Sequence, residues 1–405
     1  MVNSGDTAWL LMSAALVLVM TPALGFFYGG MVRNKNVGAT MMQCFIIIAL
    51  ISVQWVLFGY SLAFGPDKGG VIGGLEWVGL NNVGLQPNPD YAATVPHQAY
   101  MMFQMMFAII TPALIIGSFA ERMKFKAVLI FVVVWATLIY DPLAHWVWAP
   151  GGWLRSLGAQ DFAGGLVVHI SSGVAALTAA LVLRKRVGFA REAMEPGNVP
   201  FVLLGAGLLW FGWFGFNAGS ALSSGSLATS AFVVTNTAAA MGALAWMTMS
   251  WWLGGKPSII GAASGAVVGL VAITPASGFV TPMAAIIIGL GAGVFCYLAV
   301  RLRNHMKVDD SLDVWGCHGV GGTWGAIATG LFATASISGA NGLFYGNPGQ
   351  LVAQFVAVAV TWAFSFVGTF VILKVLDRTV GLTVEEHEEA AGLDVAQHGE
   401  RAYEV

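Results

Sequence analysis

Residues 8–30 read Ala8-Trp-Leu-Leu-Met-Ser-Ala-Ala-Leu-Val-Leu-Val-Met-Thr-Pro-Ala-Leu-Gly-Phe-Phe-Tyr-Gly-Gly30, an apolar stretch without a charged side chain. A bilayer core about 30 Å thick is crossed by a helix of about 20 such residues. Ten further apolar stretches follow, near residues 41–64, 98–119, 126–148, 163–183, 200–220, 227–253, 259–275, 280–300, 314–334 and 350–376. We therefore predict an all-α polytopic membrane protein with eleven transmembrane helices.

The composition agrees with this prediction and excludes several classes of protein. Hydrophobic residues make up 57% of the chain and charged residues 9%, against about 25% charged residues in a soluble domain. A disordered chain would need low hydrophobicity and high charge, and a net charge of −2 offers no basic surface to nucleic acid. The three cysteines have neither disulfide nor zinc-site spacing. Since we also find no enzyme motif, we expect no cofactor, no metal and no catalysis.

The basic residues fall almost entirely on one side of the predicted bundle. Of the 18 lysines and arginines, only Lys68 and Arg155 lie in connections on the other side. Basic loops stay in the cytoplasm, so we expect a multi-pass protein of the cell membrane with its N-terminus outside and its C-terminus in the cytoplasm. We divide the chain into a transmembrane domain, 1–377, and a cytoplasmic regulatory tail, 378–405.

Short motifs recur at an offset of five helices. Ala-Ile-Ile-Thr-Pro-Ala at 108–113 in the third span is echoed by Val-Ala-Ile-Thr-Pro-Ala at 271–276 in the eighth. An odd offset gives the two halves opposite topology, as in many transporters. We therefore expect an inverted repeat of five plus five helices, about 8–183 and 200–334, followed by an extra helix at about 350–376.

Two histidines lie inside predicted spans, whereas no Asp, Glu, Lys or Arg lies near the middle of one, which argues against a carboxylate relay. His169 is eight residues, about 12 Å, past Asp161, and His318 is five residues, about 7 Å, past Asp313. Because the two spans enter from opposite faces, the imidazoles can meet near the middle, where desolvation keeps them neutral. Asp161 and Asp313 most simply cap their helices, and Asp161 is also placed to attract a cation.

The histidine pair admits several interpretations. Neutral imidazoles, each with one donor and one acceptor nitrogen, can line a narrow path. Alternatively, each histidine bonds to a nearby backbone carbonyl and holds helices together. In a third interpretation, the two histidines ligate one haem from both sides.

Motifs along essentially the whole chain resemble those of the ammonium transporter (Amt/Mep/Rh) family, specifically its bacterial and archaeal Amt branch. The matching runs are Asn3-Ser-Gly-Asp-Thr-Ala-Trp9, Gly25-Phe-Phe-Tyr-Gly-Gly30, Phe119-Ala-Glu-Arg122, Asp161-Phe-Ala-Gly-Gly-Leu-Val-Val-His169, Trp210-Phe-Gly-Trp-Phe-Gly-Phe-Asn-Ala-Gly-Ser220, Gly316-Cys-His-Gly-Val320 and Gly392-Leu-Asp-Val-Ala-Gln-His-Gly-Glu400. The resemblance implies a homotrimer of eleven-helix protomers, each with its own pore.

The resemblance also implies roles for particular side chains. Phe107, Trp148 and Ser220 would form an outer ammonium site, with Phe103 near it, and Phe107 and Phe216 would form the gate below. The chemistry is consistent, because aromatic faces attract a cation and a serine oxygen accepts an N–H.

Below the gate, the resemblance makes His169 and His318 the twin histidines of the pore. It also implies that the tail docks on the protomers and communicates with a cytosolic PII-type signal protein. Ammonium would be captured outside, lose its proton and cross as ammonia, which would exclude potassium because potassium has no proton to lose. Methylammonium is a further candidate substrate.

Three activities fit these residues. The first is ammonium transport, in which the histidines either line the path for ammonia or carry the released proton; in the latter case transport would be electrogenic. A passive ammonia gas channel of the Rh type is a second activity, made less favourable by the matches at Trp148 and Ser220. An ammonium sensor that binds without transporting would keep the same site.

Overall fold

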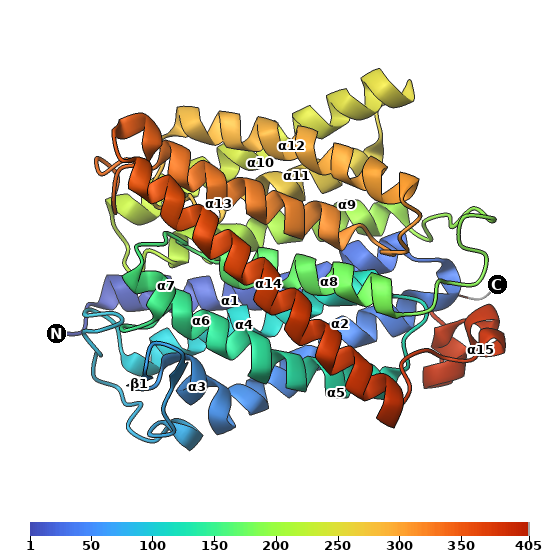
Figure 1. Ribbon diagram of the computed structural model, residues 1–405, viewed down its shortest axis with the longest axis horizontal. Coiled ribbons are helices and arrows are strands. Elements are labelled where there is room, and N and C mark those ends of the chain that lie inside the picture. The colour runs from blue at the N-terminus through green and yellow to red at the C-terminus, as the bar shows by residue number, and fades with distance from the viewer. Residues whose placement is uncertain (404–405) are drawn as a thin grey trace.

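The computed structural model describes residues 1–403, and most of it is helical (Figure 1). Within these residues, nine helices or composite helices are long and apolar enough to cross a membrane. They are Ser4–Met31, Asn34–Phe64, His97–Phe119, Phe125–Ser156, Gly165–Val182, Val199–Ala218, Ser226–Gly254, Pro282–His305 and Pro348–Thr379. The other two predicted spans are also helical, as the shorter helix α11 (Ile259–Ile273) and the pair η7 (Trp315–Gly319) and α13 (Val320–Phe332).

Five of the nine long spans are single α-helices, and the other four are composite. The single helices are α1 (Ser4–Met31), α4 (His97–Phe119), α10 (Ser226–Gly254), α12 (Pro282–His305) and α14 (Pro348–Thr379). The composite spans are η1 (Asn34–Asn36), α2 (Val37–Gln54), η2 (Trp55–Gly59) and α3 (Tyr60–Phe64); α5 (Phe125–Trp135), η4 (Ala136–Tyr140), α6 (Asp141–Trp148) and α7 (Trp153–Ser156); η5 (Gly165–Ile170) and α8 (Ser171–Val182); α9 (Val199–Trp213) and η6 (Phe214–Ala218).

The connections hold small elements at both ends of the bundle. A two-stranded antiparallel ribbon, β1 (Asp67–Lys68) with β2 (Ile72–Gly73), and η3 (Val78–Leu80) follow α3, and η8 (Leu343–Tyr345) precedes α14. The tail forms α15 (Glu386–Ala391) and η9 (Asp394–His398). Figure 1 places the N-terminus at one end of the bundle and the tail at the other.

Helix α4 is the central helix of the bundle. Almost every residue of α4 is buried by the helices around it, whereas α10, α12 and α14 keep apolar side chains such as Phe232, Phe295 and Phe370 exposed. A helix that is apolar all round needs an apolar environment on every side. The protein supplies it for α4, and the bilayer or a second protein surface must supply it for the outer helices.

Glycines bring the two histidine-bearing spans into close contact. A Cβ on Gly173, in α8, would lie 2.0 Å from the backbone nitrogen of Gly319, in η7. Real side chains cannot approach so closely, so only glycine permits this crossing. Because of it, η5 and η7 pack directly against each other.

Asp141 is fully buried at the start of α6, well inside the composite span Phe125–Ser156, although no Asp, Glu, Lys or Arg was expected near the middle of a span. Its Oδ2 accepts a hydrogen bond of 2.8 Å from Gln54 Nε2. Its Oδ1 and the Oε1 of Gln54 have no partner among residues 1–403. Two acceptors without a donor in one buried pair indicate that Asp141 carries a proton, which would let it donate.

We therefore expect Asp141→Asn to keep the stability of the wild type, because its amide can donate an N–H where the ionised carboxylate could not. Asp141→Ala leaves Gln54 with only its 3.2 Å bond to Thr137 Oγ1 among the described residues and should cost about 1–3 kcal/mol. Apparent melting temperatures in detergent compare the three proteins. An Asn variant as unstable as the Ala variant would show that the charged form is the one the fold requires.

Candidate functional site

A cavity of ≈ 180 Å³ opens at the end of the bundle that carries the N-terminus. The cavity lies at this end because Ser224, four residues after the cavity residue Ser220, donates its backbone N–H to Asp6 at the start of α1. The cavity is lined by Tyr100, Gln104, Phe107, Trp148, Phe162 and Ser220, with Asp90 and Arg155 among the residues around it. It brings together three of the side chains that the sequence assigned to an outer ammonium site.

The aromatic walls of this cavity are held in place by hydrogen bonds and ring packing. The Phe107 and Trp148 rings meet edge to face at 6.0 Å, and Trp148 Nε1 donates to the Asp161 carbonyl at 2.9 Å. Ser220 Oγ donates its proton to the Phe216 carbonyl at 2.8 Å, so its lone pairs are available to a donor. The cavity therefore offers two aromatic faces and a hydroxyl acceptor.

Phe103 is not one of the residues that line this cavity. Its ring is fully buried behind Phe107, edge to face at 4.9 Å between centroids. Gln104, the next residue of α4, lines the cavity instead.

The rings of Phe107 and Phe216 separate the cavity from a second, much smaller space. Their centroids lie 4.3 Å apart and their planes are inclined by 41°. Phe107 lines the outer cavity, whereas Phe216 lines the inner space together with His169 and His318. That space holds ≈ 10 Å³, at the lower limit for one water molecule.

The two histidines meet side by side, as their placement on spans from opposite faces predicted. Their Nδ1 atoms lie 3.3 Å apart, and their ring centroids are 5.3 Å apart with the planes inclined by 30°. Both residues lie on π-helical segments, η5 and η7, and Phe216 lies on a third, η6. Such segments shift side chains relative to a regular helix and are frequent at functional sites.

Thr274 fixes which nitrogen of each ring carries the proton. Its hydroxyl donates to the Leu270 carbonyl at 2.8 Å, so the oxygen can only accept from Trp213 Nε1 at 2.9 Å and from His169 Nε2 at 3.3 Å. In a neutral His169, a protonated Nε2 leaves Nδ1 as the acceptor. His318 Nδ1 must then donate to it, which leaves His318 Nε2 as an acceptor without a partner among residues 1–403.

This geometry disfavours two of the interpretations left open by the sequence. Neither His169 nor His318 bonds to a backbone carbonyl within residues 1–403. Two nitrogens at hydrogen-bond distance leave no room for an iron and a porphyrin between them. The described residues also contain no cluster of three or more His, Cys, Asp or Glu side chains that could hold a metal ion.

The two aspartates ahead of the histidines differ from each other. Asp161 accepts four backbone N–H bonds, from Gly164, Gly165, Leu166 and Val167, at 2.6–3.2 Å. Asp313 instead forms an ion pair with Arg303. The backbone N–H at the start of η7, from Trp315, goes to Asp310 at 2.8 Å, so the capping role expected for Asp313 belongs to its neighbour.

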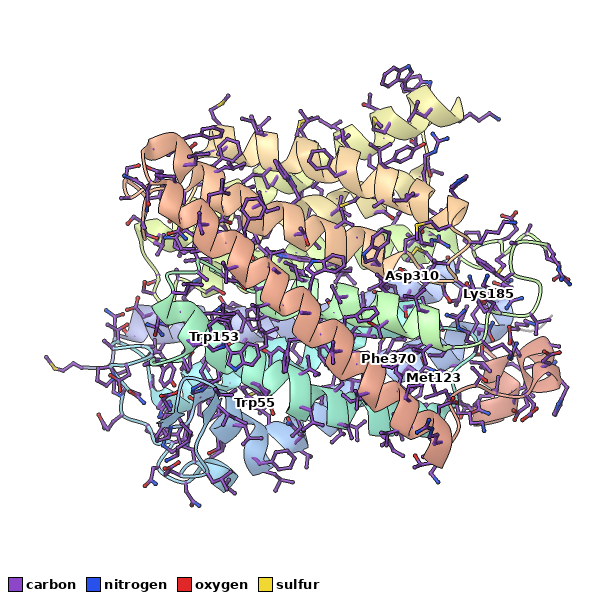
Figure 2. The ribbon with its side chains drawn as sticks, viewed as in Figure 1. Trp55, Met123, Trp153, Lys185, Asp310 and Phe370 are labelled. Carbon is purple, nitrogen blue, oxygen red and sulfur yellow. The ribbon has the colours of Figure 1, made fainter. Side chains whose placement is uncertain are left out.

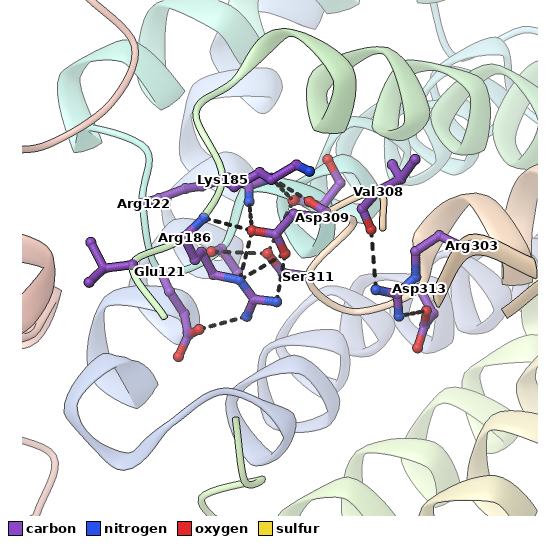
Figure 3. A network of polar contacts seen from close by, with 12 residues as sticks. Glu121, Arg122, Lys185, Arg186, Arg303, Val308, Asp309, Ser311 and Asp313 are labelled. Atoms are coloured by element: carbon purple, nitrogen blue, oxygen red, sulfur yellow. Dashed lines mark hydrogen bonds and ion pairs between the residues drawn. The ribbon is translucent and has the colours of Figure 1, made fainter. Parts of the chain in front are cut away.

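A network of buried charges ties the loops together at the end of the bundle opposite Trp153 (Figures 2 and 3). Asp309 pairs with Arg122 and, at 2.8 Å, with Arg186. Arg186 also binds Glu121 at 2.7 Å, and Glu121 binds Arg33 at 3.0 Å. These residues come from four separate segments, so the network holds the segments in one arrangement.

The arginines keep both carboxylates of this network charged. Burial alone would raise the pKa of Asp309, but the attraction of Arg122 and Arg186 outweighs it and lowers that pKa below its usual value. In the same way, Arg186 and Arg33 overcome the effect of burial and lower the pKa of Glu121.

The tail is packed against this same end. Glu389 accepts from Arg184 at 2.8 Å and from the backbone of Val187 at 2.6 Å. Asp394 accepts from the backbone N–H groups of Gly38 and Ala39 at 3.0 and 2.7 Å. The tail therefore contacts two segments of the charge network, the one that contains Arg186 and the start of α2 that follows Arg33.

Comparison with known proteins identifies the family. A model of the Ammonium Transporter Family matches residues 8–403. The chain belongs to the ammonium transporter family. It is 54% identical over 403 residues to an ammonium transporter of Bacillus subtilis, which covers 99% of this chain and 98% of that protein. It is 48% identical over 401 residues to the ammonium transporter Amt1 of Archaeoglobus fulgidus, with 99% and 100% covered.

Solved structures agree with the fold. Mep2 of Candida albicans superimposes with a TM-score of 0.90 at 36% identity, covering 96% of this chain and 88% of that one. A structure described as a sensor Amt protein gives 0.91 at 29% identity, covering 97% and 98%. The protein is thus an all-helical, multi-pass membrane transporter for ammonium and not an enzyme.

Sequence reasoning missed two polar residues of the site. Thr274 belongs to the repeated Thr-Pro motif, where a polar residue in an apolar span could have indicated a hydrogen-bonding role. Gln104 is likewise a polar residue in the apolar third span, but the outer site was assigned to the nearby Phe103 and Phe107 instead.

We expect Thr274→Val to lower ammonium flux into proteoliposomes about tenfold, the effect of losing one hydrogen bond of about 1.4 kcal/mol. Valine cannot accept from His169, so the ring loses its fixed tautomer. Thr274→Ser keeps the hydroxyl and serves as the matched control. Equal fluxes in the Val and Ser variants would contradict a positioning role for Thr274.

Asp309→Asn should destabilise the protein by about 3–5 kcal/mol, because it leaves Arg122 and Arg186 buried without their counter-charge. The pKa of Asp309 is lowered by folding, so its contribution is present above the unfolded value of about 4 and is lost as the pH falls through the folded value. The difference in the free energy of unfolding between the wild type and Asp309→Asn should therefore become smaller as the pH is lowered. Apparent melting temperatures measure it, with the exposed Asp377→Asn as control; a gap independent of pH would contradict the assignment.

Proposed function

We propose that the protein captures ammonium in the outer cavity, removes one proton, and conducts ammonia past the histidine pair. The observation that carries this proposal is the order of the parts along one line. A cation-attracting cavity is followed by the Phe107–Phe216 pair, and this is followed by a space of molecular size beside His169 and His318.

Capture depends on replacing the hydration of the ion. The faces of Phe107 and Trp148 attract a cation, and Ser220 accepts one of its N–H groups. Phe103 supports the position of Phe107 from behind. Methylammonium, which keeps several N–H groups and adds only a methyl, is a candidate second substrate.

Deprotonation would supply selectivity. The aromatic pair and the apolar walls below it make passage of a charge costly, whereas neutral ammonia passes without that cost. Potassium cannot become neutral, so it is rejected. His318 Nε2, the free acceptor, would receive an N–H of the passing ammonia.

The released proton would pass to His318 Nε2 while the Nδ1 proton of His318 passes to His169 Nδ1, so that charge moves separately from ammonia and transport is electrogenic. His318 Nδ1 donates to His169 Nδ1, so the pair is already joined by the kind of bond along which a proton moves. Asp161, whose own backbone carbonyl accepts the hydrogen bond from Trp148, would contribute to the electric field that attracts a cation. Asp313, paired with Arg303, would stabilise the entry of the opposite helix.

Transport is favoured over sensing by the relatives. The curated relatives named as ammonium transporters are 44–54% identical, whereas the structure described as a sensor is 29% identical. A passive gas channel is the second candidate, since the same path would serve it.

We further propose the arrangement of the protein in the cell membrane. Eleven helices in an inverted five-plus-five repeat, residues 1–377, would place the N-terminus outside and the tail, 378–405, in the cytoplasm, which the distribution of basic residues supports. The exposed apolar faces suit lipid and a homotrimer. The docked tail would be the contact for a PII-type signal protein.

The test is electrical. Reconstituted protein should give an inward current after an ammonium jump and none after a potassium jump, because only ammonium can be deprotonated. His169→Ala and His318→Ala should abolish the current or let potassium pass. Internal pH is recorded in the same liposomes.

Each other outcome has a distinct meaning. A rise of internal pH without current would overturn the electrogenic step and favour passive ammonia conduction. Tight ammonium binding with neither signal would favour a sensor.

A further inference from the structure

Gln104 is a buried polar residue of the outer cavity without an assigned role. It lies in α4 at the fourth position after Tyr100 and three before Phe107, so the three side chains share one face of the helix. All three line the cavity. The residue is 8% exposed, which is unusual for a glutamine unless its polar atoms have partners.

The two polar atoms of Gln104 are in different situations. Nε2 donates to the Tyr100 hydroxyl at 3.3 Å. Oε1 is buried and has no partner among residues 1–403. A buried carbonyl without a donor is costly, and such an atom at a ligand cavity is satisfied when the ligand brings the donor.

We propose that Gln104 Oε1 accepts a hydrogen bond from the bound ammonium ion and, with Ser220 Oγ, forms a two-acceptor site between the aromatic faces. This inference rests on the proposed function and names a further residue of the same site. Tyr100 holds the amide by its nitrogen, which leaves the oxygen as the unpartnered polar atom of a side chain that lines the cavity. A neutral carbonyl attracts the cation but, unlike a carboxylate, adds no full charge that would hinder its release or deprotonation.

The site also explains the packing of α4. Phe103 is turned toward Gly219, where a Cβ would lie 2.8 Å from its ring. This leaves the adjacent position of the helix, Gln104, to face the cavity. The aromatic pair Phe103–Phe107 supports the wall, and Gln104 supplies the polar contact.

Proteoliposomes containing Gln104→Leu should show a KM for ammonium raised at least about tenfold, the factor expected for one hydrogen bond to a charged group. The maximal rate should be unchanged, because the bond contributes to capture. Gln104→Glu, which has nearly the same shape and adds a negative charge, should lower the KM. Gln43→Leu removes another buried glutamine, from α2 and away from the cavity, and should leave the KM unchanged.

Ser220→Ala, measured beside these variants, separates this inference from the proposed function. If Ser220→Ala raises the KM but both Gln104 variants match the wild type, the Gln104 contact is wrong and the capture site stands. If Gln104→Leu fails to fold, the Gln104→Glu result alone decides, and an unlowered KM overturns the contact. A wild type that moves no ammonium overturns the proposed function and this inference with it.

Discussion

The hydrogen bond between the Nδ1 atoms of His169 and His318 is the interaction around which the two histidine-bearing spans are arranged. Two polar rings inside an apolar core are costly unless their nitrogens have partners. Three of these four nitrogens have one, and the proposed function leaves the fourth, His318 Nε2, for ammonia. The glycine contact between Gly173 and Gly319 brings the two spans close enough, and π-helical segments turn both rings toward each other. Thr274 then sets the direction of the proton in the bond.

The same rule explains the charged end of the molecule. Arg122, Arg186 and Asp309 are nearly or fully buried, yet each carries its charge because its counter-charges lie beside it. Ser311 of the loop that leads into η7 is bonded to the carbonyls of Ser118 and Ala120. The segment that begins the His318 span is therefore held by the network, and the tail is packed on the same loops.

The sequence alone predicted the histidine contact, because a span entering from each face determines where the two rings can meet. It predicted the Phe107–Phe216 pair through the family motifs. It assigned Phe103 to the outer site and missed Gln104, because one residue changes the direction of a helical side chain by about 100°. The cap was assigned to Asp313, whereas Asp310 accepts the backbone N–H of Trp315, because helix starts are the least predictable boundaries.

The central claim is that a neutral, hydrogen-bonded imidazole pair lines the path of ammonia. Nitrogen-15 NMR of histidine-labelled protein in lipid bilayers at about neutral pH tests it most directly, with His318→Ala used for assignment. The account predicts two neutral rings, with His169 protonated on Nε2 and His318 on Nδ1. An imidazolium at either position, or the opposite pair of tautomers, would contradict it.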